Sequence, residues 1–372
     1  RRTGKRSKME ARKKFLAASL RQGWAQAPGI VCALSGGGDS VAMLYLMKEY
    51  FRGKVAAAHL DHCTRNGESH HDAEFARRLC GEWNIPCYVK TVEVHESRQT
   101  GESFEMAGRR ARYEHFEETA KLCGYDFIAV AHNADDVVES QLLNLARGTG
   151  IPGLRGIPER RGNIVRPVID FSREELRKLL REAGVKWCDD YTNDESDYMR
   201  NKVRNLLIPW IRENLNAGFD KVMLGLAKQA SEETTEKEAE AAALLDKTGF
   251  ELAPALAAWH TDSLPAVSAI RLKEMLRLQG VRLSLPVLSR ERTELLLSLI
   301  RRGGKWRFQW ARDIEVCYSQ RGIGWLHRAD IEKNAADVKN KEKAENAEIA
   351  ENDKKAEKTK NIIENKLPWW AR

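Results

Sequence analysis

Three consecutive glycines between an apolar run and a helical pattern constrain the fold of this chain more than any other feature. The apolar run covers residues 30–34, the glycines lie within Ser35-Gly36-Gly37-Gly38-Asp39-Ser40, and a helical pattern follows from Val41. Glycine lets the backbone approach a ligand closely, and the amides of such a turn, with the helix N-terminus behind them, favour an anion. The sequence therefore predicts a strand, a phosphate-binding turn and a helix in succession.

Two common phosphate-binding motifs do not fit this turn. A Walker A loop ends in Gly-Lys followed by Ser or Thr, and Asp39 stands where that Lys would be. A dinucleotide-binding turn needs a third, spaced glycine, whereas Asp39 and Ser40 follow Gly38 here. The alternative of a glycine-rich turn without a ligand is disfavoured by the strand before it, the helix after it and the Asp-Ser pair inside it.

The hexapeptide resembles the signature of the PP-loop ATP pyrophosphatases, which cleave ATP between its α and β phosphates. The resemblance implies that ATP is a cofactor and that backbone amides of the turn hold its phosphates, assisted by two serine hydroxyls. The residues concerned are Ser35, Gly36, Gly37, Gly38, Asp39 and Ser40.

Short apolar runs alternate with helical patterns over the first third of the chain. Strands are expected at 29–34, 54–60, 86–92 and 126–131, and helices at 39–51, 70–83 and 103–123. This alternation is typical of a Rossmann-type α/β fold, a parallel sheet with helices on both faces. Ligands of such sheets lie beyond the carboxyl ends of the strands, where the glycine turn and residues 131–136 are expected.

The remainder of the chain divides by its composition. A helix capped by Ser172 and Glu175 is expected at 172–183, and a basic helix broken by Pro209 at 198–214. Helices near 266–279 and 289–302 and strands at 305–310, 313–318 and 323–327 are expected later. The organisation predicted is a basic N-terminal extension at 1–20, a PP-loop catalytic domain at 21–216, a helical linker at 217–248, a small α+β domain at 249–328 and a charged low-complexity tail at 329–372.

Charge and cysteine content narrow the function classes. The net charge is +8, but residues 1–14 hold eight Lys or Arg against the single acid Glu10, a surplus of 8 − 1 = 7. A nucleic-acid site in the body must therefore come from local clusters. The seven cysteines never form a Cys-x-x-Cys pair, which favours reduced thiols in a cytoplasmic protein over a metal cluster. The sequence has no run of about 18 apolar residues, so no membrane span is expected.

A second group of polar residues follows the strand expected at 126–131. Asp136 and Glu139 are three residues apart on a predicted helix and share one face, and His132 precedes them by about one turn. Acids at a helix N-terminus also complement the helix dipole, which is the structural alternative. Opposite a phosphate loop, two carboxylates can hold Mg²⁺, bind an ammonium group or accept its proton.

This second group extends the resemblance to one family. The pattern His-x-x-Asp-Asp-x-x-Glu-Ser, followed by Leu-x-Arg-Gly-Thr-Gly-Ile-x-Gly-Leu-x-Gly-Ile, is similar to the tRNA(Ile)-lysidine synthetases. Residues 105–113, Arg166-Pro167, 187–193 and 198–205 fit the same family, so the likeness runs from about Gly29 to Pro209. It implies that ATP adenylates the wobble cytidine of a tRNA(Ile) with a CAU anticodon, and that free L-lysine then displaces AMP.

The resemblance also implies roles for particular residues. The catalytic set is Asp39, His132, Asp136 and Glu139, with Asp39 and Asp136 as the expected Mg²⁺ ligands. Asp136 and Glu139 would serve the metal and the lysine amine, and which does which is left open. The set expected to contact tRNA is Arg109, Arg112, Arg147, Asn193, Arg200 and Arg204, with ordinary surface charge as the alternative for each. The domain at 249–328 would bind tRNA as well, and a homodimer is one expectation for the oligomeric state.

Three other functions compete with this interpretation. A PP-loop tRNA thiolase would use paired cysteines or a cluster, and the chain has no Cys-x-x-Cys pair. A small-molecule synthetase of the GMP or asparagine type would need no RNA surface and usually carries an amidotransferase domain, which is not apparent. A non-catalytic RNA-binding protein would have no need of Ser35, Asp39, Ser40, Asp136 and Glu139 together.

Overall fold

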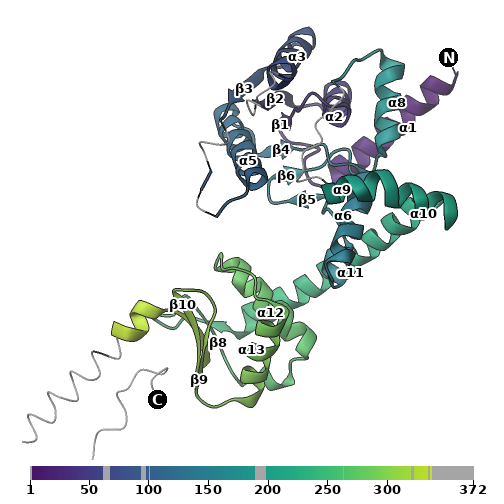
Figure 1. Ribbon diagram of the computed structural model, residues 1–372. Coiled ribbons are helices and arrows are strands. Elements are labelled where there is room, and N and C mark those ends of the chain that lie inside the picture. The colour runs from purple at the N-terminus through teal and green to yellow at the C-terminus, as the bar shows by residue number, and fades with distance from the viewer. Residues whose placement is uncertain are drawn as a thin grey trace, which may run out of the picture. The chain divides into compact units, whose positions relative to one another are not determined.

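The computed structural model describes residues 2–61, 68–93, 98–99, 101–188, 198–262, 264–319, 322–333 and 336. The chain forms two compact units, Arg1–Glu232 and Glu233–Arg372 (Figure 1). None of the helices in these ranges is both long enough and apolar enough to cross a membrane.

A six-stranded sheet forms the centre of the first unit, in the order β3-β2-β1-β4-β6-β5. Its strands pair in parallel except for β5, which is antiparallel to β6. The strands are β1 (Gly29–Ala33), β2 (Lys54–Asp61), β3 (Cys87–Thr91), β4 (Phe127–Ala129), β5 (Arg160–Arg161) and β6 (Ile164–Val165).

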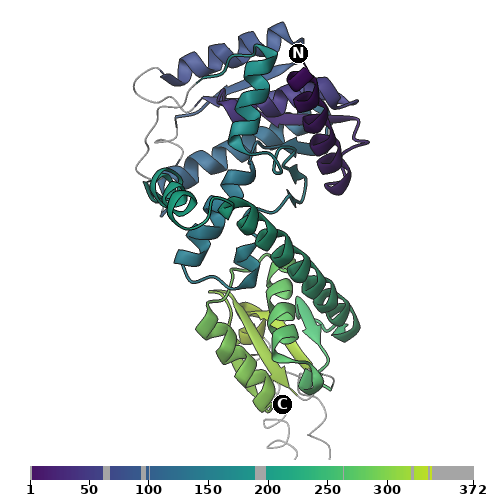
Figure 2. The same ribbon diagram turned by 90° about the vertical axis from the view of Figure 1, so that its right-hand side faces the viewer.

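Helices cover both faces of this sheet (Figures 1 and 2). Successive strand residues point to opposite faces: Ile30 and Cys32 of β1 pack with α1, α2, α3 and α8, whereas Val31 packs with Phe116 of α5. The first unit contains α1 (Arg2–Arg21), α2 (Gly38–Tyr50), α3 (Glu68–Glu82), α5 (Phe104–Cys123), α6 (Ala134–Ala146), α7 (Ile151–Leu154), α8 (Arg173–Ala183), α9 (Tyr198–Lys202), α10 (Ile208–Asn214) and the first half of α11 (Phe219–Thr248).

The predicted fold class is confirmed, and the differences are local. No strand is expected from the sequence at residues 148–170, but they contain β5 and β6, two-residue strands too short to leave a pattern. The segment expected as a basic extension, 1–20, belongs to α1 and contributes Phe15 and Ala18 as fully buried side chains.

The basic helix at 198–214 is not broken at Pro209 as the sequence suggested. Between α9 and α10 the backbone widens into a π-helical turn at Val203–Leu207, with the Ile208 amide bonded to the Val203 carbonyl. Proline lacks an amide hydrogen and crowds the carbonyl four residues before it. The wider turn keeps the segment helical ahead of Pro209, which is the second residue of α10.

The second unit is an antiparallel sheet covered by two helices, as expected for a small α+β domain. Its strand order is β7-β8-β11-β10-β9. Trp259 and Trp325 lie at its centre, with ring centroids 4.6 Å apart. The elements are β7 (Gly249–Phe250), β8 (Ala257–Trp259), α12 (Ala269–Arg282), α13 (Arg290–Arg302), β9 (Trp306–Gln309), β10 (Ile314–Ser319) and β11 (Gly322–His327). Helix α12 begins three residues later than expected because Ser268 caps it.

Candidate active site

The phosphate loop is a tight turn held by its own serines. Gly36 has a φ of +95°, a conformation that L side chains rarely adopt. Ser40 Oγ donates to the Gly37 carbonyl at 2.9 Å and accepts from the Ser35 amide at 3.2 Å. Gly37 caps α2 without a side-chain hydrogen bond, so the amides of the first turn of α2 are left for an anion.

One wall of the loop comes from the segment that follows α8. The Cys188 amide donates to the Gly36 carbonyl at 3.0 Å. A Cβ added to Gly38 would lie 3.4 Å from the Trp187 ring. Glycine therefore allows this segment to pack directly against the loop.

Asn133 joins the phosphate loop to the N-terminus of α6. Its Nδ2 donates to Asp39 Oδ2 at 3.0 Å, while its Oδ1 accepts from the Asp136 amide at 3.1 Å. Asp136 Oδ2 in turn accepts from the Asn133 amide at 3.0 Å, which completes a capping box. The structure thus brings Asp39 and Asp136 together through Asn133, a residue that was not among the predicted site residues.

Three arginines surround the acidic cluster formed by Asp39, Asp136 and Glu139. Arg200 Nε donates to Glu139 Oε2 at 2.9 Å, and Arg204 Nε donates to Glu139 Oε1 at 2.7 Å. All three arginines lie within 3.6 Å of Asp136 Oδ1. We call Arg173, Arg200 and Arg204 the arginine cage.

Arg173 is the functional candidate that the sequence analysis missed. Its guanidinium lies 3.6 Å from Asp39 Oδ2, 3.2 Å from Asp136 Oδ1 and 3.4 Å from Glu139 Oε1. It is the first residue of α8, and its amide donates to Asp135 Oδ2 at 2.8 Å. Arg173 follows β6, and residues after a parallel strand lie at the ligand-binding edge, but a two-residue strand leaves no sequence pattern that would point to this position.

Burial and the arginines drive the pKa values of the acidic cluster apart. Burial raises the pKa of Asp39 to about 6, against the opposing charge of Arg173. Burial also raises the pKa of Asp136, with Arg200 opposing it. Burial acts in the same direction on Glu139, but the hydrogen bonds and charges of Arg204 and Arg200 outweigh it and lower the pKa of this carboxyl. Glu139 is therefore the permanent anion of the three.

His132 is a neutral imidazole in this setting. Burial, followed by the positive charge of Arg166 and Arg200, lowers the pKa of His132 to about 3. Arg166 Nε donates to His132 Nδ1 at 3.4 Å, so the ring hydrogen lies on Nε2. A neutral His132 can hydrogen-bond to a ligand but has no proton to release near pH 7.

The remaining predicted residues are spread over the surface. Arg109 and Arg112 lie exposed on α5, close enough for their charge to act on His132. Arg147 is exposed at the C-terminal end of α6, the end opposite His132 and Asp136, so it does not join them. Asn193 lies outside the described residues.

Two groups of side chains have the chemistry to hold a metal. Asp39 Oδ1 is buried and has no hydrogen-bond partner, and a carboxylate oxygen of this kind suits Mg²⁺. Each oxygen of Asp136, by contrast, already accepts hydrogen bonds. Close to Gly36, ligand atoms of His71, Asp72 and Cys188 lie within 4.8 Å of one another, a nitrogen, oxygen and sulfur set suited to softer metals.

Comparisons with known proteins agree with this geometry. A family model of the PP-loop domain matches residues 7–211, more than half of the chain. A tRNA(Ile)-lysidine synthase of Caldanaerobacter subterraneus is 42% identical over 188 residues, covering 50% of this chain and 40% of the relative. Another from Porphyromonas gingivalis is 39% identical over 197 residues, covering 52% of this chain and 43% of the relative. The chain thus matches less than half of each relative's length.

Among solved structures, the U34-tRNA thiolase NcsA from Methanococcus maripaludis, with its [4Fe-4S] cluster, has a similar fold. The TM-score is 0.50 at 16% identity, over 61% of this chain and 80% of that chain. At this identity the likeness concerns the fold alone.

Proposed function

The chain belongs to the PP-loop domain family, and from that premise we propose that it is a carbon–nitrogen ligase that joins L-lysine to the wobble cytidine of tRNA(Ile) with a CAU anticodon. The observation that carries the proposal is the link between the phosphate loop and the acidic cluster, made by Asn133 between Asp39 and Asp136. It joins a site for an activated phosphate to a site for a cationic amine.

The first step activates the RNA base. The ring carbonyl oxygen of the cytidine attacks the α-phosphorus of ATP, and the bond to the pyrophosphate breaks. The amides of the first turn of α2 and the hydroxyls of Ser35 and Ser40 hold the phosphates. Mg²⁺, held by Asp39 with Asp136 as the second expected ligand, would neutralise phosphate charge there. The unpartnered Asp39 Oδ1 supports Asp39 as the principal ligand.

The second step is attack by the lysine amine on the activated ring carbon, with AMP as the leaving group. The amine must be neutral to attack, and lysine amines are normally charged near pH 7. Glu139 keeps its negative charge and attracts the ammonium group, whereas the raised pKa of Asp136 makes it the better proton acceptor. His132 would then orient the base through Nε2, without itself transferring a proton.

Two basic surfaces are proposed to hold the tRNA. Arg109 and Arg112 of α5 lie on the His132 side of the first unit, and single-stranded loops are commonly held by such Arg contacts. The second unit, whose role as a tRNA-binding domain stays a prediction, has a groove of about 590 Å³ between α13 and β9.

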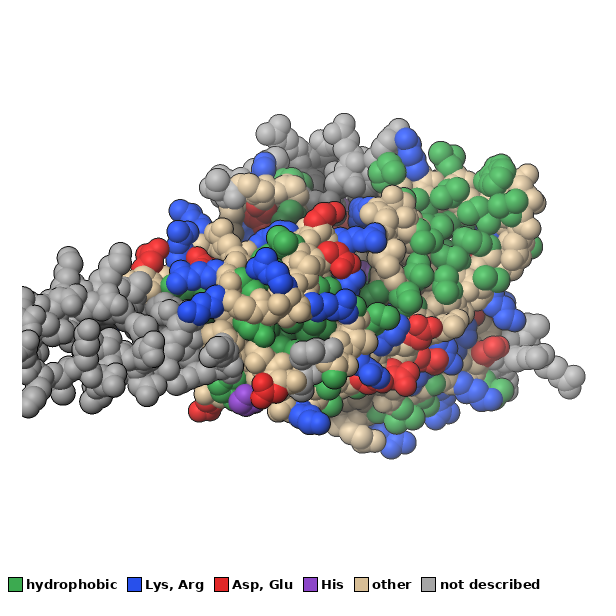
Figure 3. Space-filling model, turned by 90° about the horizontal axis from the view of Figure 1, so that it is seen from below, with side chains coloured by type: hydrophobic (Ala, Val, Ile, Leu, Met, Phe, Trp, Pro, Cys, Tyr) green, Lys and Arg blue, Asp and Glu red, His purple; other side chains and the backbone are tan. Residues whose placement is uncertain are grey.

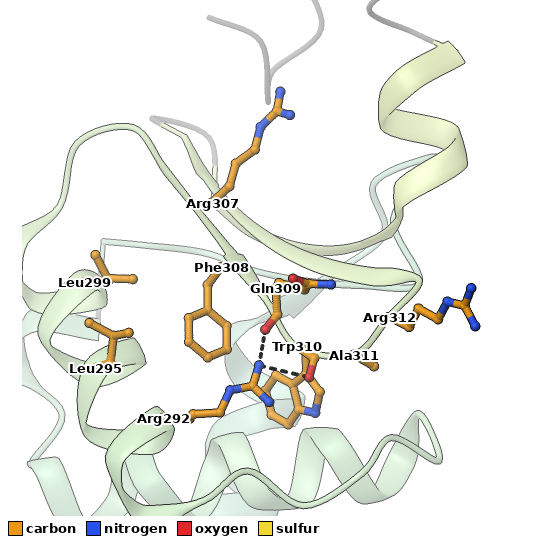
Figure 4. Close-up of a pocket in the computed structure, with 9 residues that line it drawn as sticks. All are labelled: Arg292, Leu295, Leu299, Arg307, Phe308, Gln309, Trp310, Ala311 and Arg312. Atoms are coloured by element: carbon orange, nitrogen blue, oxygen red, sulfur yellow. Dashed lines mark hydrogen bonds between the residues drawn. The ribbon is translucent and has the colours of Figure 1, made fainter.

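The groove combines apolar and cationic side chains. Figure 4 shows Phe308 opposite Leu295 and Leu299, with Arg307 and Arg312 extending from the rim. Arg292 has a structural role, because its guanidinium donates hydrogen bonds to the backbone carbonyls of Gln309 and Trp310. Arg307 and Arg312, which extend from the rim of the groove, are the side chains proposed to contact RNA phosphates.

A homodimer is proposed on the apolar surface formed by the π-helical turn, α10 and the start of α11. Leu206, Trp210, Leu215 and Val222 each have more than half of their surface exposed. Figure 3 shows a broad group of apolar side chains on its right, the side on which α10 lies in Figure 1. Exposed apolar patches of this kind mark protein interfaces. Sedimentation velocity should show a dimer that Trp210→Glu converts to a monomer.

The thiolase alternative has less support. In the described part of the chain the group with metal-binding geometry contains one cysteine, Cys188, and not the several thiolates that a cluster requires. The location is a separate proposal: a protein that acts on tRNA(Ile) would meet its substrate in the cytoplasm.

Product analysis tests the proposed function. With ATP and CAU tRNA present, the protein should release pyrophosphate before lysine is added and AMP after it is added. A tRNA with a different wobble base is the control and should give neither product. Release of ADP and inorganic phosphate would contradict the proposal, because it would place the cleavage at the γ-phosphate.

A further inference from the structure

Arg173 contacts all three members of the acidic cluster with one side chain. Its Nε faces Asp39 of the phosphate loop, and its Nη2 faces Asp136 and Glu139 of α6. The side chain is 18% exposed, so these contacts are largely screened from water. A single guanidinium therefore spans the ATP half and the amine half of the site.

The arginine cage occupies the oxygens that a lysine amine would need. Glu139 is 1% exposed, and both of its oxygens accept from arginines. Asp136 Oδ1 faces the same three guanidinium groups. A fourth cation would meet occupied acceptors and three like charges. The ligand-free arrangement thus opposes binding of an ammonium group until at least one arginine moves.

We propose that Arg173 is a positioning residue whose side chain leaves Asp136 and Glu139 for the phosphates of bound ATP, so that ATP must bind before the lysine amine. The inference rests on the proposed function and adds an order of binding to it. Phosphate is a strong partner for guanidinium, because it accepts two parallel hydrogen bonds. Arg173 already reaches Asp39 at the edge of the phosphate loop, so a short movement exchanges one anion for the other.

The backbone around Arg173 is built to let the side chain move alone. Its amide is held by Asp135 Oδ2, and the N-terminus of α8 is fixed by the capping box of Ser172 and Glu175. The two oxygens of Glu139 keep their bonds to Arg200 and Arg204 after Arg173 leaves. The buried carboxylate consequently keeps its compensating charge throughout the exchange.

Lysine binding by the full-length protein tests this order. Affinity for lysine would be measured with and without Mg²⁺ and a non-hydrolysable ATP analogue. We expect the analogue to strengthen lysine binding about tenfold or more, and lysine to strengthen analogue binding by the same factor. In Arg173→Gln, lysine should bind equally well with and without the analogue. Arg181→Gln, an exposed position two turns along α8, is the matched control and should keep the full coupling.

The outcomes separate this inference from the proposed function. If the wild-type protein ligates lysine but Arg173→Gln retains wild-type coupling, the role of Arg173 is wrong and the proposed function stands. If wild-type lysine binding does not respond to the analogue, the order of binding is also wrong. If lysine binds in neither state and no ligation occurs, both fail. Arg173→Lys, which keeps the charge without the paired donors, should fold normally and show reduced coupling, so a misfolded Gln variant would not hide the result.

Discussion

Arg204 and Glu139 form a two-point ion pair in the interior of the first unit. Arg204 Nε lies 2.7 Å from Glu139 Oε1, and its Nη2 lies 2.9 Å from Oε2. Parallel bonds of this kind are among the stronger charge-assisted hydrogen bonds in proteins. They come from residues 65 positions apart, and they lower the pKa of a carboxyl group that burial alone would raise.

Replacing Asp136 should separate catalysis from RNA binding. In Asp136→Asn we expect the rate of ligation to fall about 10²- to 10⁴-fold, because the amide cannot accept the amine proton. This is the usual contribution of a positioned general base. Affinity for tRNA should stay within about twofold of wild type, since the RNA is proposed to be held by Arg109 and Arg112 of α5 and by the second unit. Single-turnover kinetics and filter binding measure the two effects. Glu182→Gln, exposed on α8, is the control, and an unchanged rate in Asp136→Asn would remove its catalytic role.

Asp39 should make stability depend on pH in a defined direction. Its pKa is about 6 in the folded state against an ordinary value of 3.8, so the folded protein holds this proton more tightly. The contribution of Asp39 to the free energy of unfolding should therefore decline by about 3 kcal/mol as the pH rises from about 4 to above 6.

Urea unfolding of wild type and Asp39→Asn at both ends of this range measures the effect. Asn cannot titrate, so the free energy of unfolding of the variant should rise relative to that of the wild type as the pH rises. The variant should nevertheless lose ATP-dependent activity. A difference between the two proteins that does not change with pH would contradict the raised pKa.

The left-handed backbone of Gly36 should make this position intolerant of side chains. Gly36→Ala places a Cβ at a φ of +95°, which should cost about 1–2 kcal/mol and distort the loop, so affinity for ATP should fall. Gly81→Ala is the matched control, because Gly81 lies in α3 with open space around it. That change should stabilise the protein by about 0.5–1 kcal/mol. Thermal unfolding would show whether the two substitutions change stability in opposite directions. Nucleotide titration would show whether Gly36→Ala weakens ATP binding.

Salt dependence should identify the arginines of the second unit that contact RNA. Arg312→Gln should weaken tRNA binding and lower the slope of log affinity against log salt by about one, as expected for a lost phosphate contact. Lys228→Gln on α11, at an exposed position outside the groove, should leave the slope unchanged. Equal slopes for wild type and Arg312→Gln would exclude this groove from the RNA interface.

Much of the site could be predicted from the sequence because its signals are local. The glycine turn and the spacing of Asp136 and Glu139 depend on neighbours within a few residues, and both lie where a parallel sheet collects ligand-binding residues. Arg173 could not be found in this way, because its partners lie on α2 and α6 and it follows a two-residue strand.

Closeness in the sequence does not show where Arg147 lies relative to the acidic cluster, and its predicted contact with tRNA stays a prediction. Arg147 follows the acidic motif closely in the chain, but α6 separates it from Asn133 by its full length, about 20 Å at 1.5 Å per residue. The π-helical turn at 203–207 was likewise hidden, because a proline predicts a disturbance of a helix but not its form. Local patterns therefore placed the elements well, and contacts between elements determined which residues meet.

The most direct test of the account is the fate of labelled lysine. The protein would be incubated with ATP, Mg²⁺, labelled lysine and unmodified CAU tRNA(Ile), and the RNA would then be digested to nucleosides and analysed by mass spectrometry. We expect one lysine on the wobble cytidine and one AMP for each lysine incorporated. Label that stays free, while AMP forms and sulfur from an added donor enters the RNA, would contradict it.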